Sequence, residues 1–335
     1  MLENLSPLPW EEKNWINEVS SWLKSSLAVH SIEMLAAPIQ VRSAPWSVVY
    51  QIVTNKGLHY FKALCPVLKY EPAVTRQLSL WQPNTIQSVL EINRHQGWML
   101  MPDGGFTLRQ TLEKKPSLNY WKKILPQYAR FQQAMIPHQQ ELLALEVHDR
   151  RLQILPTLAS KLSADRESLL VDLPDGLSVS EYETLNQVMP KLQTLCERLS
   201  QYNIPETLQH DDFHDGNIFV VQNGFRFFDW AESFVAHPFF TLVVTLRSIA
   251  YRFGLEEGSA ELQELANGYL REWQEYASLK HLQEAFELSM VIGRINRALT
   301  WYMVVSSLPG PYRANESDAV PGWVQLFLEK ITLYV

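Results

Sequence analysis

The sequence predicts an α+β fold with two unequal lobes, a small N-terminal lobe built on an antiparallel sheet and a larger, mainly helical C-terminal lobe. The chain has 335 residues, more than the roughly 250–300 at which a single hydrophobic core stops growing. Segments rich in β-branched and aromatic residues lie within the first hundred residues, and helical patterns follow from about residue 107. We therefore predict one domain over residues 1–102 and a second over residues 103–335.

Apolar periodicity and turn residues predict the elements of the smaller lobe. Trp15, Val19, Trp22 and Leu23 recur at helical spacing and predict a leading helix. A second helix is predicted to begin on Pro72, because proline suits the first helical position. The predicted helices cover residues 9–28 and 72–80, and the predicted strands cover residues 38–43, 46–54, 58–64, 85–93 and 97–102, with a hairpin turn at 55–57.

The larger lobe is predicted to be almost entirely helical. A short pair of strands around residues 218–228 is the only strand signal expected after residue 107, and residues 148–172 form a segment rich in charge. The predicted helices cover residues 107–114, 118–143, 180–202, 237–252, 258–276, 280–305 and 321–333.

Composition and charge exclude several classes of function. The net charge is −7 and no run of five or more like charges occurs, which argues against nucleic-acid binding and favours a small partner. The apolar stretches are interrupted and too short to cross a bilayer, and residues 1–30 contain no apolar signal-peptide core. The two cysteines, Cys65 and Cys196, lie far apart, which fits reduced thiols. We expect a cytoplasmic protein, monomeric or homodimeric, without a membrane partner.

The segment LQHDDFHDGNIFVVQNGFRFFDWAES, residues 208–233, concentrates groups suited to phosphoryl transfer. His210, Asp212 and Asn217 follow the pattern H-x-D-x-x-x-x-N, and Asp229 follows at the far end of an expected hairpin. Phosphoryl transfer needs a carboxylate near the acceptor hydroxyl, and an amide oxygen and a second carboxylate on Mg²⁺. The alternative is that these polar residues cap helices and fill turns, which would crowd carboxylates without a counter-ion.

This segment resembles the catalytic and metal loops of the aminoglycoside phosphotransferase and choline kinase family, which has a protein-kinase-like fold. His214 and Trp230 also stand at matching positions, and Asp211 replaces the usual glycine. The resemblance implies that Asp212 is the catalytic base and that Asn217 and Asp229 are magnesium ligands. His210 is then expected to brace the loop, with His214 and Trp230 in supporting positions.

The same resemblance implies a nucleotide site in the smaller lobe. Lys62 ends a predicted strand and resembles the lysine that binds the α- and β-phosphates, with Glu71 as its partner. Tyr60 lies on the same face of that strand and is expected near the adenine. Taken alone, the position of Lys62 is typical of a lysine whose ammonium group reaches solvent. The position of Glu71 is typical of a first-turn acid that the helix dipole favours.

The remaining nucleotide contacts are expected from backbone segments. Leu100, Met101 and Pro102 lie where the linker between lobes would contact the adenine edge, although Pro102 has no N–H to donate. No G-x-G-x-x-G occurs in the first hundred residues. The loop over the phosphates is therefore expected at residues 43–47, with Ser43 and Ser47 supplying hydroxyls.

These residues predict an ATP- or GTP-dependent, Mg²⁺-requiring kinase that phosphorylates a hydroxyl of a small molecule. A catalytically inactive nucleotide-binding module of the same fold and a metal-dependent hydrolase are the alternatives. The acceptor stays open between amino alcohols, aminoglycosides and sugars. Asp211, Asp215 and Glu232 are predicted either to make the mouth of the cleft negative or to be solvated surface groups. Arg150 and Arg151 are predicted to grip an anion or to form surface salt bridges.

Overall fold

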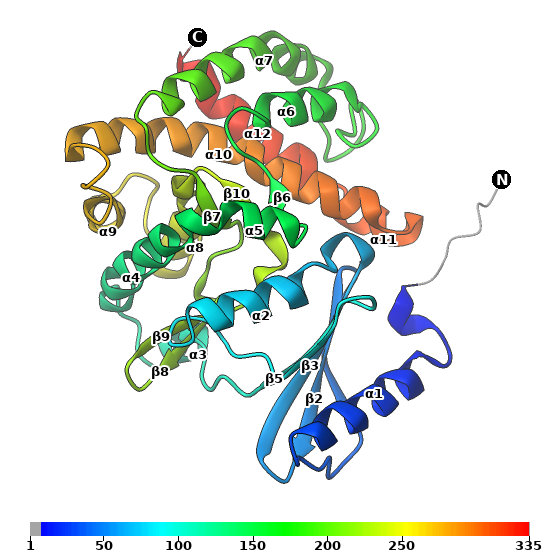
Figure 1. Cartoon of the computed structure of the whole chain (residues 1–335). Coiled ribbons are helices and arrows are strands. Elements are labelled where there is room, and N and C mark those ends of the chain that lie inside the picture. The colour runs from blue at the N-terminus through cyan, green and yellow to red at the C-terminus, as the bar shows by residue number, and fades with distance from the viewer. Residues whose placement is uncertain (1–7, 335) are drawn as a thin grey trace, which may run out of the picture. The chain divides into compact units, whose positions relative to one another are not determined.

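A computed structural model describes residues 8–334, and the chain divides into two compact units (Figure 1). The first unit comprises the described part of Met1–Thr107 together with Phe219–Ala231 and Ser306–Asn315. The second comprises Leu108–Ile218, Glu232–Val305 and the described part of Glu316–Val335. The domain boundary expected at residues 102 and 103 stays a prediction.

The first unit contains the predicted antiparallel sheet. Its five strands, in the order β1-β2-β3-β5-β4, all pair antiparallel with their neighbours. They are β1 (Ile39–Ala44), β2 (Ser47–Thr54), β3 (Gly57–Leu64), β4 (Glu91–Asn93) and β5 (Trp98–Pro102). Strand β3 is central, so Lys62 lies opposite Val49 of β2 and Met99 of β5.

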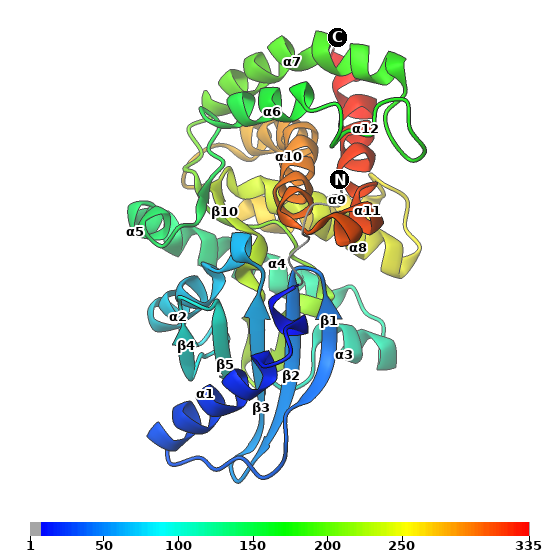
Figure 2. The same ribbon diagram turned by 90° about the vertical axis from the view of Figure 1, so that its right-hand side faces the viewer.

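Helix α1 (Trp15–Val29) packs on one face of this sheet (Figures 1 and 2). Its buried side chains share one stripe, because they recur at intervals of three and four residues; they are Trp15, Val19, Leu23 and Leu27. Phe61 and Ala63 of β3 belong to the same core cluster. Since side chains alternate across a strand, Tyr60 and Lys62 project from the other face of β3.

The strand pair predicted around residues 218–228 forms and, from Phe219 onward, belongs to the first unit. Strands β8 (Ile218–Val221) and β9 (Gly224–Phe227) form a two-stranded sheet, and Phe227 forms a bridge with Ile86. The Phe227 amide donates to the Thr85 carbonyl at 2.8 Å, and the Gln87 amide donates to the Phe227 carbonyl at 3.1 Å. The strand predicted over residues 85–93 is therefore wrong except for β4, because its first part pairs with β9 instead.

Two helices complete the first unit. Helix α2 (Glu71–Trp81) begins one residue before the predicted start, with Pro72 in its first turn. The short helix α11 (Gly310–Glu316), which was not predicted, contributes most of its residues to this unit.

The second unit is mainly helical, as predicted. Helix α9 packs against α4 and α8, and α7 packs against α6 and α12 (Figure 2). The helices are α3 (Leu108–Lys114), α4 (Asn119–Met135), α5 (Gln139–Ala144), α6 (Leu155–Ala164), α7 (Val179–Ser200), α8 (Thr241–Phe253), α9 (Ala260–Arg271), α10 (Leu279–Ser307) and α12 (Ala319–Ile331).

Local signals fix several helix ends. Ser178 and Glu181 form a capping box at the start of α7, and Gly254, with φ +63°, ends α8 in the left-handed conformation. The single helix predicted over residues 118–143 is instead α4, a 3₁₀ turn at Ile136–His138 and α5. Pro137 lies in that turn, where it cannot donate to the preceding helical carbonyl.

The prediction of only one strand pair after residue 107 was wrong. A second sheet, in the order β6-β10-β7, is formed by β6 (His148–Asp149), β7 (Thr207–His210) and β10 (Ser233–Ala236). All residues of β7 and β10 are buried. Such short, fully buried strands show no alternation of polar and apolar residues, which is the signal that identifies a strand in sequence.

The edge of the first sheet is partly hydrophobic and irregular. Ile39 and Val41 of β1 are about half exposed, and the register of β1 shifts between Gln40 and Arg42. A bulge and a charged side chain on an edge strand both hinder pairing with another chain.

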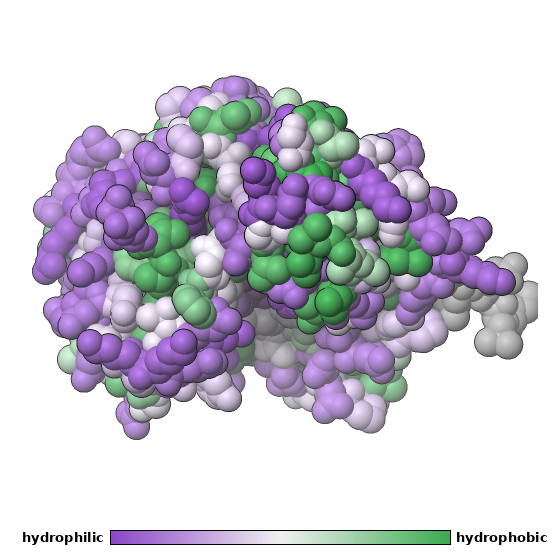
Figure 3. Space-filling model, turned by 90° about the horizontal axis from the view of Figure 1, so that it is seen from below, coloured by the Kyte–Doolittle hydropathy of each residue, from purple (hydrophilic) through white to green (hydrophobic). Residues whose placement is uncertain are grey.

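One face of the molecule carries hydrophobic residues among mostly hydrophilic ones (Figure 3). Among residues 8–334, no helix combines the length and apolar character needed to span a bilayer.

Candidate active site

A buried lysine lies between two carboxylates in the first unit. Lys62 Nζ lies 2.7 Å from Glu71 Oε2 and 2.6 Å from Asp229 Oδ1. Glu71 is fully buried and Lys62 is 6% exposed, so solvent does not reach the pair directly. The structure therefore brings three predicted nucleotide and metal residues to one point and rules out the alternative in which Lys62 extends into solvent.

Three different elements carry these side chains. Lys62 projects from the central strand β3, Glu71 is the first residue of α2, and Asp229 follows β9. Asp229 has φ +67°, a left-handed conformation that aspartate tolerates better than most residues. The next amide, that of Trp230, donates to Glu71 Oε1 at 3.1 Å, and the Trp230 side chain is fully buried. The segment that carries Asp229 is thus fixed to the start of α2.

Burial and pairing act in opposite directions on these charges. Burial alone lowers the pKa of Lys62, but the charges of Asp229 and Glu71 outweigh burial, so the pKa of Lys62 is raised. Burial raises the pKa of Glu71 to about 7, although the charge of Lys62 opposes this shift. The lysine is therefore held as a cation.

A second group of predicted residues lies in the loop after β7 in the second unit. Asp212 Oδ2 lies 3.3 Å from His214 Nε2 and accepts a hydrogen bond from Asn217 Nδ2 at 3.3 Å. Asn217 Nδ2 also donates to the Asp212 carbonyl at 2.9 Å. The 3₁₀ turn Asp215–Asn217 closes the loop, because it brings the asparagine back to the aspartate five residues earlier.

His210 lies beneath this loop. Its side chain is fully buried, and its Nδ1 accepts a hydrogen bond from the Asp212 amide at 3.2 Å. The His210 amide in turn donates to the hydroxyl of Tyr128 at 2.9 Å, which links the loop to α4. These contacts are the kind expected of a bracing residue.

The charges around Asp212 favour its ionised form. Burial alone raises the pKa of Asp212, but the hydrogen bond to His214 and the charge of Arg297 hold it well below its usual range. Burial alone lowers the pKa of His214, but its hydrogen bond to Asp212 raises it above the ordinary value. Asp212 is therefore a carboxylate at neutral pH.

Arg297 of α10 is a residue of this site that sequence reasoning missed. Its Nη2 lies 3.3 Å from Asp212 Oδ1, and its Nη1 pairs with Glu232 and lies 3.5 Å from Asp211 Oδ2. Arg294, Asn296 and Arg297 stand together in an otherwise apolar stretch of helix. Polar residues in such a stretch indicate buried partners, and that signal was available in the sequence.

The acidic residues thought to be solvated or to face the substrate are largely buried and paired. Asp211 and Asp215 are each 2% exposed. Asp211 Oδ1 accepts from Asn296 Nδ2 at 2.9 Å, and Asp215 Oδ1 accepts from Arg109 Nε at 3.0 Å. The alternative that these two aspartates are solvated surface groups was therefore wrong, and their attraction of a cationic substrate stays a prediction. Burial raises the pKa of Glu232 to about 7, although the charge of Arg297 opposes this shift.

The two arginines considered as an anion grip also have partners in the second unit. Arg150 is buried and donates from Nη1 to the Asn296 carbonyl at 2.9 Å. Arg151 forms a two-point contact with Asp149, with Nη2 to Oδ2 at 2.6 Å and Nε to Oδ1 at 2.9 Å. Arg150 is thus part of the protein interior.

The other residues predicted to contact the nucleotide lie on the first sheet. Tyr60 is half-buried, and its hydroxyl accepts from Gln51 Nε2 at 3.2 Å. Ser43 and Ser47 flank the tight turn between β1 and β2. In β5, the Leu100 carbonyl accepts from the Leu90 amide at 2.8 Å and the Pro102 carbonyl accepts from Gln87 Nε2 at 2.8 Å. Strand β4 pairs with β5 only as far as Leu100, so Met101 lies beyond that pairing.

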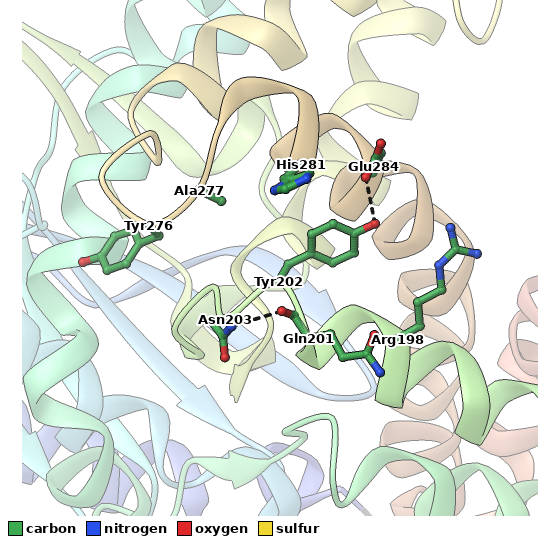
Figure 4. Close-up of a pocket in the computed structure, with 8 residues that line it drawn as sticks. All are labelled: Arg198, Gln201, Tyr202, Asn203, Tyr276, Ala277, His281 and Glu284. Carbon is green, nitrogen blue, oxygen red and sulfur yellow. Dashed lines mark hydrogen bonds between the residues drawn. The ribbon is translucent and has the colours of Figure 1, made fainter.

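A separate surface pocket lies in the second unit and contains none of the predicted site residues (Figure 4). It has a volume of about 460 Å³ and lies between the end of α7 and the start of α10. Its polar lining includes a hydrogen bond from the Tyr202 hydroxyl to Glu284 Oε2 at 3.1 Å (Figure 4). The lining residues are Arg198, Gln201, Tyr202, Asn203, Tyr276, Ala277, His281 and Glu284.

Comparison with known families identifies the chain. The sequence model of the phosphotransferase enzyme family matches residues 54–281, which is more than half of the sequence. The chain belongs to this family. The family resemblance predicted from residues 208–233 is therefore confirmed, and the chain is a phosphotransferase by family. No curated protein matches the chain by sequence.

Solved structures confirm the predicted protein-kinase-like α+β fold. An ethanolamine kinase from Plasmodium vivax aligns with a TM-score of 0.64 and 13% identity over 98% of both chains. A choline/ethanolamine kinase family protein from Mesorhizobium loti aligns with a TM-score of 0.60 and 10% identity over 94% of this chain and 95% of that chain. An amicoumacin kinase in complex with AMP-PNP and Ca²⁺ aligns with a TM-score of 0.57 and 13% identity over 94% and 96%.

Proposed function

We propose that this phosphotransferase is a kinase that uses ATP or GTP and Mg²⁺ to phosphorylate a hydroxyl group of a small molecule. The observation that carries the proposal is the buried ion-paired group of Lys62, Glu71 and Asp229, in a chain whose Asp212 and Asn217 are also in contact. A similar structure with a bound ATP analogue, the amicoumacin kinase, supports the nucleotide.

Lys62 is proposed to bind the nucleotide phosphates. Its ammonium group has three donors, and Glu71 and Asp229 keep it charged and fixed at the end of β3. Electrostatic stabilisation of the transferring group is strongest when such charges are held in place beforehand, because nothing has to reorganise during the reaction. Glu71 therefore acts by holding Lys62.

The chain offers suitable donors for Mg²⁺. Asn217 uses Nδ2 for both of its contacts with Asp212, which leaves the amide oxygen as the atom that suits a cation. Together with the Asp229 carboxylate this is a set of hard oxygen donors, and Mg²⁺ typically takes only one or two carboxylates in addition to phosphate and water oxygens. When bound, the ion neutralises charge on the phosphates.

Asp212 is proposed to receive the proton of the acceptor hydroxyl. The hydroxyl oxygen forms a bond to the γ-phosphorus, the bond from that phosphorus to the leaving oxygen of the nucleoside diphosphate breaks, and the proton passes to the carboxylate. The lowered pKa of Asp212 keeps its carboxylate ionised at neutral pH, so the carboxylate can accept the proton. His210 and Asn217 hold the loop in place.

The base and phosphates of the nucleotide are assigned to the first sheet by the same proposal. Tyr60 offers a ring face for the purine, Met101 lies beyond the pairing with β4, and Ser43 and Ser47 border the turn expected over the phosphates. The Leu100 side chain lies in the core with α1, so that residue and Pro102 are assigned backbone contacts only.

The proposal is tested first by the variant Asp212→Asn. Loss of a general base lowers turnover by roughly 10²–10⁴-fold. Thermal melting with MgATP and MgGTP identifies the nucleotide, and release of the diphosphate in a library of hydroxyl compounds identifies the acceptor. In Asp212→Asn, turnover should be lost while the nucleotide still raises the melting temperature. Asp318→Asn, at an exposed aspartate, is the matched control and should retain full turnover.

A second variant separates the kinase from a binding module without catalysis. Asp229→Ala should remove the Mg²⁺-dependent part of the nucleotide-induced melting shift, because it deletes a proposed ligand of the ion. A wild-type chain that binds nucleotide but transfers phosphate to no acceptor would support the inactive module. Full turnover in Asp212→Asn would refute the assignment of the base.

A further inference from the structure

The guanidinium group of Arg297 lies among three carboxylates in the second unit. It contacts Asp212 at 3.3 Å and Asp211 at 3.5 Å and forms an ion pair with Glu232. The arginine is 5% exposed. Arg297 lies on α10, outside the 208–233 segment and 85 residues after Asp212 in sequence. We propose that Arg297 is a positioning residue that orients the carboxylate of Asp212 for proton transfer, an inference that rests on the proposed function.

Helix α10 fixes both Arg297 and Asp211, one of the carboxylates that the arginine contacts. Asn296 Nδ2 and the Thr300 hydroxyl both donate to Asp211, the neighbour of the proposed base. Gln209 Nε2 donates to the same aspartate at 3.1 Å. Arg297 itself lies over the ring of Trp301, 5.5 Å from the centroid, one turn further along the helix. The guanidinium is therefore held by Glu232, by the Trp301 ring and by this fixed Asp211, so its position does not depend on Asp212 alone.

The contacts of Asp212 occupy both of its carboxylate oxygens. Arg297 Nη2 faces Oδ1, whereas His214 Nε2 and Asn217 Nδ2 face Oδ2. Rotation of the carboxylate would break contacts on both sides, so its plane is fixed. A fixed base avoids the loss of about 10²-fold in rate that a displacement of 1 Å can cause.

Charge balance is the alternative role for Arg297. Three carboxylates near one cation, one of them buried and two partly exposed, would repel one another, and an arginine could be needed only to offset that repulsion. The two roles differ in what should happen when a carboxylate other than Asp212 is neutralised. Glu232 supplies that comparison, because it pairs with the same Nη1 atom and lies outside the catalytic motif.

The test compares Arg297→Lys, Arg297→Gln and the double variant Arg297→Gln with Glu232→Gln. Lysine keeps the charge but loses the planar fork, so we expect kcat to fall about 10-fold for lysine and on the order of 10²-fold for glutamine. KM for MgATP should stay within about twofold, because the lost interaction serves the transition state. If Arg297 positions Asp212, the double variant keeps the low kcat; recovery of kcat there would show charge balance instead and overturn the proposal.

Arg294→Lys is the matched control. Arg294 is equally buried, lies one turn earlier on α10 and pairs with Glu257 at 2.7 Å. Its replacement should lower the melting temperature without changing kcat. An equal fall of kcat in Arg294→Lys and Arg297→Lys would assign the effect to the helix as a whole and would also overturn the proposal.

A measurement that does not depend on catalysis separates this proposal from the proposed function. In urea unfolding, Arg297→Gln, Asp212→Asn and the double variant form a thermodynamic cycle. We expect the shifts in midpoint to be non-additive, because the 3.3 Å contact between the two side chains is lost in either single variant. If the wild-type chain transfers phosphate to no acceptor, the proposed kinase function is refuted. If the midpoint shifts are additive, the contact between Arg297 and Asp212 has no energetic effect and the positioning role is refuted.

Discussion

At the scale of single residues, the candidate site consists of cations held between several carboxylates. Lys62 has two such partners and Arg297 has three. Buried charges of this kind add little net stability when they are paired, but they cost a great deal when one partner is removed. Both cations are therefore points where a single substitution has a large effect.

The first prediction concerns Lys62→Met. Without the ammonium group, the fully buried Glu71 and the partly exposed Asp229 lose their shared counter-ion, so the free energy of unfolding should fall by about 3–5 kcal/mol. The double variant Lys62→Met with Glu71→Gln removes one of the stranded carboxylates and should recover part of that loss. Urea unfolding at pH 7 measures both values. A single variant as stable as the wild type would show that the two carboxylates do not depend on this lysine.

The second prediction concerns Gly216 in the loop that carries Asp212. A Cβ atom at this position would lie 2.7 Å from the His214 ring and 2.9 Å from Arg109 Nη2. Because His214 contacts Asp212, Gly216→Ala should displace the ring and lower kcat by roughly 10-fold or more. Gly268→Ala is the control, since a Cβ there meets no atom within 4 Å on helix α9, and it should raise stability by up to about 1 kcal/mol. Comparison of kcat and unfolding midpoints checks both outcomes.

At the scale of elements, the sequence predicted the long periodic segments and missed the short buried ones. The stripe from Trp15 to Leu27 predicts α1 because four apolar residues share one face of a helix. Strands β7 and β10 have four residues each and are buried on both faces, so no period distinguishes them. The predicted strand over residues 85–93 failed because β9, more than 130 residues away in sequence, pairs with its first part.

In the candidate site too, the sequence revealed residues that are close in the chain and missed a contact between distant ones. Asp212 and Asn217 lie five residues apart, so the motif that contains them is visible in the sequence. Arg297 contacts Asp212 across 85 residues, and no local pattern connects the two. A sequence indicates which residues share a loop, whereas contacts between distant helices and loops depend on how the helices pack.

The third prediction concerns His237, between β10 and α8. The side chain is 1% exposed, its Nδ1 accepts from the Phe239 amide at 3.3 Å, and burial lowers its pKa to about 3. The unfolded chain binds this proton near pH 6.5 whereas the folded chain does not, so stability is fully present above pH 6.5 and is lost as the pH falls toward 3. The slope from this residue is up to about 1.4 kcal/mol per pH unit.

The measurement is urea unfolding between pH 7 and pH 4.5. His237→Gln should lose less stability over this range than the wild type, because glutamine does not titrate. His95→Gln, at an exposed histidine, is the control and should keep the wild-type slope. Equal slopes in all three chains would exclude His237 as the source of acid sensitivity.

At the scale of the whole molecule, the first unit is assembled from distant parts of the chain. The segment Phe219–Ala231 groups with the residues before Thr107 rather than with its sequence neighbours. It supplies Asp229 to Lys62, the Phe227 bridge to Ile86, and the Ala231 carbonyl that accepts from the Tyr70 hydroxyl. Phe227 and Trp230 are both fully buried, so this segment also contributes to the core.

This assembly gives the last prediction, which concerns a chain that ends at Thr107. It keeps all five strands of the first sheet and helices α1 and α2, but it loses Phe227, Trp230 and the Asp229 partner of Lys62. Loss of two large buried aromatic side chains costs about 3–5 kcal/mol each, which is comparable to the whole stability of a domain of this size. Residues 1–107 should therefore melt without a cooperative transition.

The control joins residues 218–231 to Thr107 through a short Gly/Ser linker, which restores these contacts and should restore a cooperative melt in circular dichroism. If the shorter chain melts as sharply and at the same temperature as the joined one, the later segment is not part of the cooperative unit, and the grouping with the first unit has no energetic meaning.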